Sequence, residues 1–358
     1  MAERGRGRTS PNPMVGAILV KAGRVVGQGY HARAGGPHAE RLALQRAGAK
    51  ARGATLYINL EPCTHYGKTP PCAPEVIEAR VSRAVIGMED PNPLVKGRGI
   101  ESLKTAGIDV RVGVLGKECR KMNEAFCKYI TEKVPFVILK TASTFDGKIA
   151  TRKGTSEWIT GEISRRFVHR LRDGADGVLV GIGTVLRDDP MLTARIRRGR
   201  DPYRIILDSR LRIPERARVF ENAPSRVIIV TTHRGSKEKA ARLEKRGVHV
   251  FFVGSRHGRV DVKACLKRLG KAGIVTLLVE GGSEVNGAFL DARAIDQFFQ
   301  FLAPKWIGDP KAFGIFGGAG IRDLEDAIPL REVRVRKMGK DFLLEGYAGK
   351  GGSPCSQG

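Results

Sequence analysis

The feature that most constrains the fold is an alternation of short apolar runs with amphipathic stretches along most of the chain. Runs such as 55–60 (TLYINL) and 83–88 (RAVIGM) have the length of strands, and helical periodicity begins near His38. The runs 14–20 and 24–31 flank Lys21-Ala22-Gly23 and predict a hairpin. We expect an α/β protein, because this alternation lets helices cover the faces of a sheet.

The length of 358 residues suits two domains. We place the first at 1–132, ending in one helix over 117–133, and the second at 135–349. The Gly/Ser-rich end, 350–358, predicts a disordered tail. In the second domain we expect a mainly parallel sheet. Its predicted strands are 177–182, 203–209, 226–232, 249–254 and 274–282, and its predicted helices are 162–173, 237–246, 261–272 and 284–293.

The composition narrows the class of protein. No apolar run approaches the ~18 residues that span a bilayer, and the basic N-terminus has no apolar core of a secretory signal. The six cysteines are therefore expected to be reduced thiols of a cytoplasmic protein. The net charge of +26 suits either nucleic acid or small anions such as phosphate esters, and the charge alone does not choose.

A metal site is predicted by His38, Cys63 and Cys72. One imidazole and two thiolates leave the fourth position of a tetrahedral zinc ion for water. Zinc brings the pKa of such a water towards neutrality, and a nearby carboxylate that does not bind the metal can move protons. Glu40, in the segment His38-Ala39-Glu40, supplies that carboxylate.

The order His-x-Glu and then Pro-Cys resembles the zinc-dependent nucleobase deaminases, although eight residues separate the cysteines here instead of two. Further motifs make the chain similar to the bifunctional deaminase-reductases of riboflavin biosynthesis. These motifs are TSPNPMVGA, LEPCTHYGKTPPC, DPNPLVKGRG, STFDGKIA, GIGTVLRDDPMLT and VEGGSEVNGAF. The resemblance implies a cytidine-deaminase-like α/β/α sandwich followed by a dihydrofolate-reductase-like α/β domain.

The same resemblance implies the chemistry of the first domain. Zn²⁺ and Glu40 would deaminate a diamino-ribosylamino-pyrimidinone phosphate, with Glu40 moving protons until ammonia leaves. The matching positions for the pyrimidine and its phosphate are Asn12, His31, His65 and Lys68. The enlarged loop between the two cysteines would help to grip this substrate.

The second domain is implied to reduce the ribosyl chain with NADPH, giving an amino-phosphoribitylamino-uracil. Catalytic positions near the reaction centre would be Lys148 and Glu280. The matching cofactor contacts are Ala142, Trp158, Thr184, Asp188, Ser209, Gly282, Ser283, Glu284, Val285, Asn286, Gly287 and Ala288. The matching substrate contacts are Ser156, Arg172, Leu192, Arg195 and Glu280.

Three alternatives stay open at this stage. The chain could be a tRNA-type nucleobase deaminase, although such an enzyme has no use for the second domain. It could be an RNA-binding protein with a structural zinc, although that function does not require Glu40. It could retain only one of the two activities. We expect a homo-oligomer that acts on a small phosphorylated pyrimidine, with no nucleic-acid or membrane partner.

Overall fold

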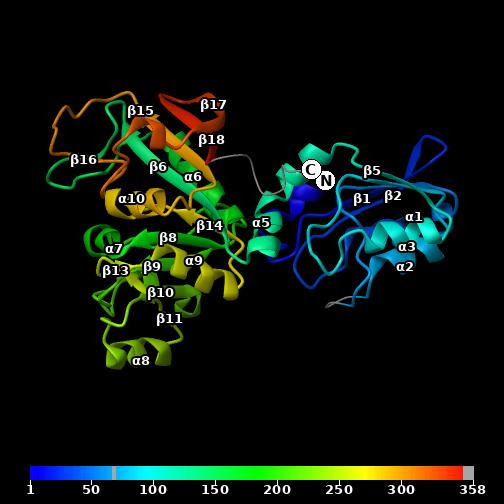
Figure 1. The fold of residues 1–358 in the computed structure, drawn as a ribbon, viewed down its shortest axis with the longest axis horizontal. Helices are drawn as coiled ribbons and strands as arrows, with labels where there is room; N and C mark the ends of the chain where they lie inside the picture. The colour runs from blue at the N-terminus through cyan, green and yellow to red at the C-terminus, as the bar shows by residue number, and fades with distance from the viewer. Residues whose placement is uncertain (67–69, 350–358) are drawn as a thin grey trace. The chain divides into compact units, whose positions relative to one another are not determined.

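The computed structural model describes residues 1–66 and 70–349 as two compact units (Figure 1). The first unit ends at Lys133 and the second begins at Val134. The tail 350–358, for which we expect disorder, lies outside the described residues. Among the described helices, none combines the length and the apolar character needed to cross a bilayer.

The N-terminal unit is built on a five-stranded sheet in the order β2-β1-β3-β4-β5. The strands are β1 (Gly16–Lys21), β2 (Arg24–Tyr30), β3 (Thr55–Ile58), β4 (Arg83–Ile86) and β5 (Asp109–Val112). The predicted hairpin is confirmed, since β1 and β2 pair antiparallel on either side of Ala22 and Gly23. Strands β3, β4 and β5 are parallel to one another.

Helix α1 is held close to this sheet. The helices of the unit are α1 (Ala39–Ala47), α2 (Cys72–Glu78), α3 (Arg98–Thr105), α4 (Gly116–Met122) and α5 (Glu124–Glu132). A Cβ atom at Gly29 of β2 would lie 2.6 Å from the carbonyl oxygen of Ala39. Only a residue without a side chain permits this approach, so Gly29 fixes where α1 begins.

The prediction of one continuous helix over 117–133 is wrong. The chain forms α4 and α5, with Asn123 between them at φ −107°. The buried Asn123 side chain accepts a hydrogen bond from the Met14 amide (2.8 Å) and donates one to the Met14 carbonyl (3.0 Å). These bonds to a distant segment override the local helical tendency.

The C-terminal unit contains a nine-stranded sheet in the order β11-β10-β9-β8-β14-β6-β15-β18-β17. The seven strands from β11 to β15 are parallel, and β18 and β17 add an antiparallel edge. The strands are β6 (Phe136–Thr144), β8 (Gly177–Gly181), β9 (Tyr203–Leu207), β10 (Val227–Thr231), β11 (His249–Phe252), β14 (Thr276–Val279), β15 (Gln297–Ala303), β17 (Leu330–Met338) and β18 (Asp341–Ala348). Two short pairs join β7 (Lys148–Ala150) to β16 (Phe313–Gly314) and β12 (Ser255–Arg256) to β13 (Arg259–Val260).

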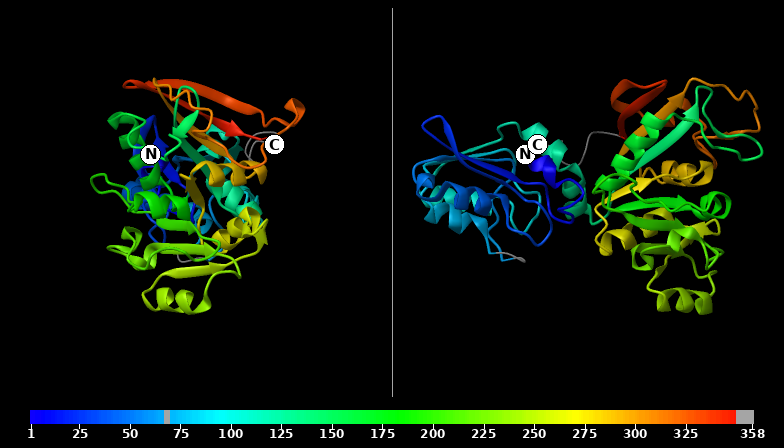
Figure 2. Two further views of the ribbon diagram at one scale, coloured as in Figure 1. Left: turned by 90° about the vertical axis from the view of Figure 1, so that its left-hand side faces the viewer. Right: turned by 180° about the vertical axis from the view of Figure 1, so that it is seen from behind.

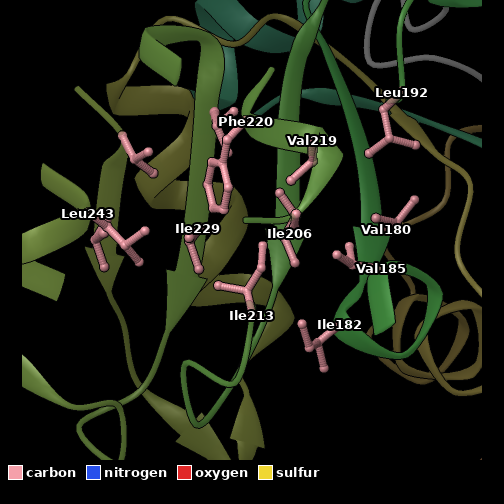
Figure 3. Close-up of a cluster of buried hydrophobic side chains, with 14 of the residues drawn as sticks. Val180, Ile182, Val185, Leu192, Ile206, Ile213, Val219, Phe220, Ile229 and Leu243 are labelled. Carbon is pink, nitrogen blue, oxygen red and sulfur yellow. The ribbon is translucent and has the colours of Figure 1, made fainter. Parts of the chain in front are cut away.

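Helices cover both faces of this large sheet (Figures 1 and 2). They are α6 (Glu162–Gly174), α7 (Ile182–Asp188), α8 (Lys237–Lys245), α9 (Val262–Lys271) and α10 (Ser283–Asp291). On one face, Ile206 and Ile229 pack with Leu243 of α8 and with Phe220 (Figure 3). On the other face, α9 and α10 bury Leu269 and Phe289. The predicted α/β class with a mainly parallel sheet is confirmed.

Helix α7 is one of the elements of this unit that were not predicted, and the strands β15, β17 and β18 are others. The predicted strand 177–182 ends at Gly181, and Ile182 begins the helix. The apolar residues Ile182 and Val185 made the segment resemble a continuing strand, but both side chains are buried in the core that the sheet shares with α8.

Candidate active sites

Three side chains from separate elements meet at one point in the N-terminal unit. His38 immediately precedes α1, Cys63 follows β3, and Cys72 begins α2. His38 Nδ1 lies 3.2 Å from Cys72 Sγ and 3.6 Å from Cys63 Sγ, and the three ligand atoms all lie within 4.8 Å of one another. Ligands of a tetrahedral zinc ion lie roughly 3.5–3.8 Å apart. The donor set and its spacing therefore fit zinc.

The backbone explains why the two cysteines meet. The carbonyl oxygen of Cys63 accepts hydrogen bonds from the amides of Cys72 and Ala73, each at 3.1 Å, and so caps the start of α2. The Cys72 amide also lies 3.4 Å from Cys63 Sγ. Hydrogen bonding from Cys72 lowers the pKa of the Cys63 thiol, which favours the thiolate, the form that binds a metal.

Glu40 lies beside this cluster without belonging to it. It is the second residue of α1, and its side chain is buried. Burial raises the pKa of the Glu40 carboxyl to about 7. A carboxyl group with a pKa near neutrality can both take and give a proton, as the predicted role requires.

The predicted pocket residues Asn12 and His31 are brought to the same place. Asn12 Nδ2 donates to His31 Nε2 (3.2 Å), and His31 Nδ1 donates to the carbonyl of Pro37 (3.0 Å). Burial lowers the pKa of His31, which agrees with a neutral ring. The rings of His31 and His38 are 5.3 Å apart. Of the two loop residues, His65 is exposed to solvent, and Lys68 lies outside the described residues.

Glu61 is a buried residue whose importance the sequence did not reveal. Its carboxylate accepts four backbone hydrogen bonds from the segment 90–100. The donors are the amides of Asp90 (3.1 Å), Gly97 (3.1 Å), Gly99 (2.8 Å) and Ile100 (3.3 Å). Glu61 therefore caps α3 and ties the DPNPLVKGRG segment to the loop that carries Cys63. The only sequence signal was its position two residues before that cysteine.

A cavity of about 1030 Å³ lies in the C-terminal unit, where the parallel strands β6, β8, β9 and β14 end. Ligands of open α/β sheets bind at this edge. The cavity is lined by most of the residues predicted for this unit, namely Ala142, Ser156, Trp158, Arg172, Thr184, Asp188, Leu192, Arg195, Ser209, Glu280, Gly282, Ser283, Glu284, Val285, Asn286 and Ala288.

Two predicted residues do not line this cavity. Lys148 is in β7, and its Nζ lies 3.5 Å from the carbonyl oxygen of Ala312. Gly287 packs against Gly317, whose backbone an added Cβ atom at Gly287 would collide with. Its role is the close packing of α10 against the loop at Gly317.

A buried charged triad forms the base of the cavity. Glu280 follows β14, and Arg172 Nε and Nη2 donate to its two carboxylate oxygens at 2.6 and 3.1 Å. Lys140 Nζ, from the neighbouring strand β6, lies 3.5 Å from Glu280 Oε2. Burial by itself would raise the pKa of Glu280, but the charges of Arg172 and Lys140 outweigh it and lower that pKa to about 2. The base is therefore an ionised carboxylate between two cations.

Lys140 is the lysine that reaches the cavity in place of the predicted Lys148. Lys140 lies on β6, a strand whose residues are mostly buried. A buried ammonium group requires an opposite charge beside it, and Glu280 supplies that charge. A single lysine in the run PFVILKTAS was the available signal. Arg172 was predicted to contact substrate, yet its guanidinium is held by Glu280 and by the carbonyl of Thr193 (3.1 Å).

The turn between β14 and α10 suits a dinucleotide. A Cβ atom at Gly282 would meet no protein atom within 4 Å, so this backbone is open to a ligand at the start of a nine-residue helix. Asn286 Nδ2 donates to the carbonyl of Ile315 (3.0 Å), whereas its buried Oδ1 has no hydrogen-bond partner in the described part of the chain. An amide or hydroxyl donor of a nicotinamide cofactor would satisfy this oxygen, so the residues fit such a cofactor.

Family models match both units. Residues 1–88 match the cytidine and deoxycytidylate deaminase zinc-binding region, and residues 135–344 match the RibD C-terminal domain.

Individual proteins are similar over almost the whole chain. The riboflavin biosynthesis protein RibD of Aquifex aeolicus is 44% identical over 96% of this chain and 94% of that protein. RibD of Escherichia coli is 38% identical over 96% and 95%. Among solved structures, Acinetobacter baumannii RibD has a TM-score of 0.87 at 36% identity, covering 97% of this chain and 95% of that one. A Thermotoga maritima diaminohydroxyphosphoribosylaminopyrimidine deaminase/5-amino-6-(5-phosphoribosylamino)uracil reductase has a TM-score of 0.84 at 41% identity, with the same coverage.

Proposed function

The chain belongs to the RibD family of bifunctional deaminase-reductases of riboflavin biosynthesis, and we propose which residues carry its two reactions. The N-terminal unit is the deaminase and the C-terminal unit is the reductase. The substrate is the diamino-ribosylamino-pyrimidinone phosphate, and the final product is the amino-phosphoribitylamino-uracil.

In the deaminase, His38, Cys63 and Cys72 hold one zinc ion. When bound, zinc supplies a water acidified enough to attack at neutral pH. The Glu40 carboxylate would accept the proton released when water adds to the ring and would pass protons to the departing amine, which leaves as ammonia. Asn12 and His31, already joined by a hydrogen bond beside His38, orient the pyrimidine ring, and His65 and Lys68 bind the phosphorylated ribose.

In the reductase, NADPH supplies a hydride when it is bound. The chain positions the ribosyl carbon with Glu280 and provides a proton from Lys140, which Glu280 holds less closely (3.5 Å) than it holds Arg172 (2.6 Å). Ser156, Leu192 and Arg195 complete the substrate side. The cofactor side is formed by Ala142, Trp158, Thr184, Asp188, Ser209 and the cavity-lining residues of the turn 282–288.

Two observations support the proposal: His38, Cys63 and Cys72 converge beside Glu40 in one unit, and a cavity with a charged triad at its base lies in the other. Incubation of the protein with the diaminopyrimidinone ribose phosphate tests it. Mass spectrometry should detect the deaminated intermediate without NADPH and the ribityl product with NADPH. Failure of both conversions would contradict the proposed substrate, and loss of one conversion would show that only that activity is absent.

The metal assignment has its own test. We expect one zinc per chain in the parent and none in Cys72→Ala, because a mononuclear site with two remaining protein ligands binds weakly. Elemental analysis that finds unchanged zinc in Cys72→Ala would exclude this ligand set.

The charge and the exposed edge strand support two proposals about partners. The charge of +26 serves small phosphate esters, so nucleic-acid binding with a steep salt dependence would contradict this proposal. The edge strand β17 exposes Leu330, Val333 and Val335, which supports a homo-oligomer because such edges favour pairing. Light scattering that detects only monomers at micromolar concentration would rule the oligomer out.

A further inference from the structure

An ion pair joins the two helices at whose starts His38 and Cys72 lie. Arg41 is the third residue of α1, and Glu75 is the fourth residue of α2. Arg41 Nε lies 3.0 and 3.1 Å from the two carboxylate oxygens of Glu75, and Arg41 Nη2 also donates to Oε1. The guanidinium thus holds the carboxylate through both Nε and Nη2, which fixes the direction of the contact as well as its distance.

Both members of this pair lie one helical turn from a proposed metal ligand. Arg41 follows His38 by three positions, and Glu75 follows Cys72 by three positions. Side chains three positions apart lie on the same side of a helix. Arg41 also follows Glu40 directly. The ion pair therefore connects the first turn of α1, which carries Glu40 and follows His38, to the first turn of α2, which begins with Cys72.

The apolar packing available to the two helices is slight. Besides Cys72, the buried apolar side chains that they contribute are Ala39, Ala43, Ala47, Ala73 and Val76. An alanine side chain is a single methyl group, and dispersion attraction grows with the number of atoms in contact. Apolar packing therefore restrains α1 against α2 only weakly, and the ion pair adds a directional restraint.

The position of Arg41 is explained by Glu75 and not by α1 itself. The first turn of a helix carries a partial positive charge, which disfavours a cation such as Arg41 and favours an anion such as Glu75. Pairing with Glu75 offsets the unfavourable term. The Arg41 and Glu75 side chains are 30% and 28% exposed, so the pair is partly shielded from water but neither charge is fully buried. Replacing one partner should therefore leave a folded unit.

We propose that Arg41 and Glu75 are positioning residues of the deaminase. Their ion pair holds α1 against α2 so that His38 and Cys72 close on one metal ion, with Glu40 kept beside it. This inference rests on the proposed zinc ligands and deepens that assignment, because it names the contact that keeps ligands from two helices at binding distance. Arg41 and Glu75 act through the helices and touch neither metal nor substrate in this role.

Metal binding by the full-length protein tests the inference without turnover. Arg41→Gln and Glu75→Gln should each weaken zinc binding roughly tenfold in competition with a chromophoric chelator, the lower end of the loss found when residues that orient metal ligands are replaced. The double variant should bind zinc no more weakly than either single variant, because both changes remove one interaction. Glu78→Gln is the matched control, since Glu78 is exposed, lies one turn further along α2 and lines the groove between α1 and α2 beside the pair.

A second readout separates positioning from stability. Co²⁺ bound in place of zinc has visible absorption bands that depend on the geometry of its ligands. We expect these bands to shift in Arg41→Gln and in Glu75→Gln and to match the parent's in Glu78→Gln. A change in the stability of the unit alone would lower Tm and leave the bands of the folded protein where they are.

Several results would overturn the inference. One is zinc affinity in both variants equal to that of Glu78→Gln. Another is an unchanged cobalt spectrum, whatever happens to Tm, because the pair would then only stabilise the unit. Losses of zinc affinity that add in the double variant would show that the two residues act independently. A parent protein that binds neither metal would refute the proposed ligand set, and this inference with it.

Discussion

Replacing Glu61 by Gln should unfold the deaminase unit at a distinctly lower temperature. The Glu61 carboxylate accepts four backbone amides, two on each oxygen. Glutamine keeps one carbonyl oxygen, so in either orientation two of the four amides face an NH₂ group. The variant therefore loses two hydrogen bonds to a charged acceptor and leaves two buried donors without a partner.

The magnitude follows from these two bonds. Each hydrogen bond to a charged group contributes about 1.5–3 kcal/mol, so the upper range is about 3–6 kcal/mol. Water can enter the loosened loop and recover part of this loss, which brings our expectation to about 3 kcal/mol. For a unit of this size that corresponds to a fall of roughly 12 °C in Tm.

The two units can be followed separately in one sample. Both tryptophans of the chain, Trp158 and Trp306, lie in the reductase unit, so tryptophan fluorescence reports that unit alone. Calorimetry records both transitions, and Glu61→Gln should shift only the one that fluorescence does not report. Glu89→Gln is the control, since Glu89 is exposed in the neighbouring segment and makes none of these bonds. A shift in Glu61→Gln no larger than in this control would refute the reasoning.

Three further predictions concern the chemistry. Glu40→Gln should retain zinc and lower deaminase turnover by about 10²–10⁴, with reduction of pre-deaminated substrate unchanged; turnover within about threefold of the parent would contradict the proton-transfer role. Gly282→Val should fold normally, because the position has open space, yet weaken NADPH binding in a fluorescence titration while ammonia release continues. Because the pKa of Glu280 is depressed to about 2, its stabilising contribution is complete above its unfolded pKa of about 4.3 and is lost as the pH falls from there towards 2. The Tm of the parent should therefore approach that of Glu280→Gln over this acid range in calorimetry, and a constant difference in Tm would disprove the assignment.

Site residues could be predicted from the sequence where the chemistry requires particular residue types at a particular spacing. His38, Cys63 and Cys72 could be grouped from their types and their order in the chain, because few arrangements other than a metal site use such a set. The parallel strands were also predictable, since their apolar runs are buried on both faces.

The residues that the sequence could not predict depend on partners far away in the chain. Lys140 can be assigned to the cavity only from the fold, because the pairing of β6 with β14 is what brings it beside Glu280. Asn123 ends a helix because of a contact with Met14, more than 100 positions earlier. A local pattern carries no information about such partners, so these features required the fold.

The tight packing of β2 against α1 affects how natural variants of this enzyme should be interpreted. Any side chain at Gly29 would push on the backbone that begins α1, and overpacking of this kind costs about 1–3 kcal/mol. The displaced helix carries Glu40, and His38 immediately precedes it. A strain with a substitution at Gly29 could therefore require riboflavin in its growth medium even though every metal ligand and every pocket residue in its gene is intact.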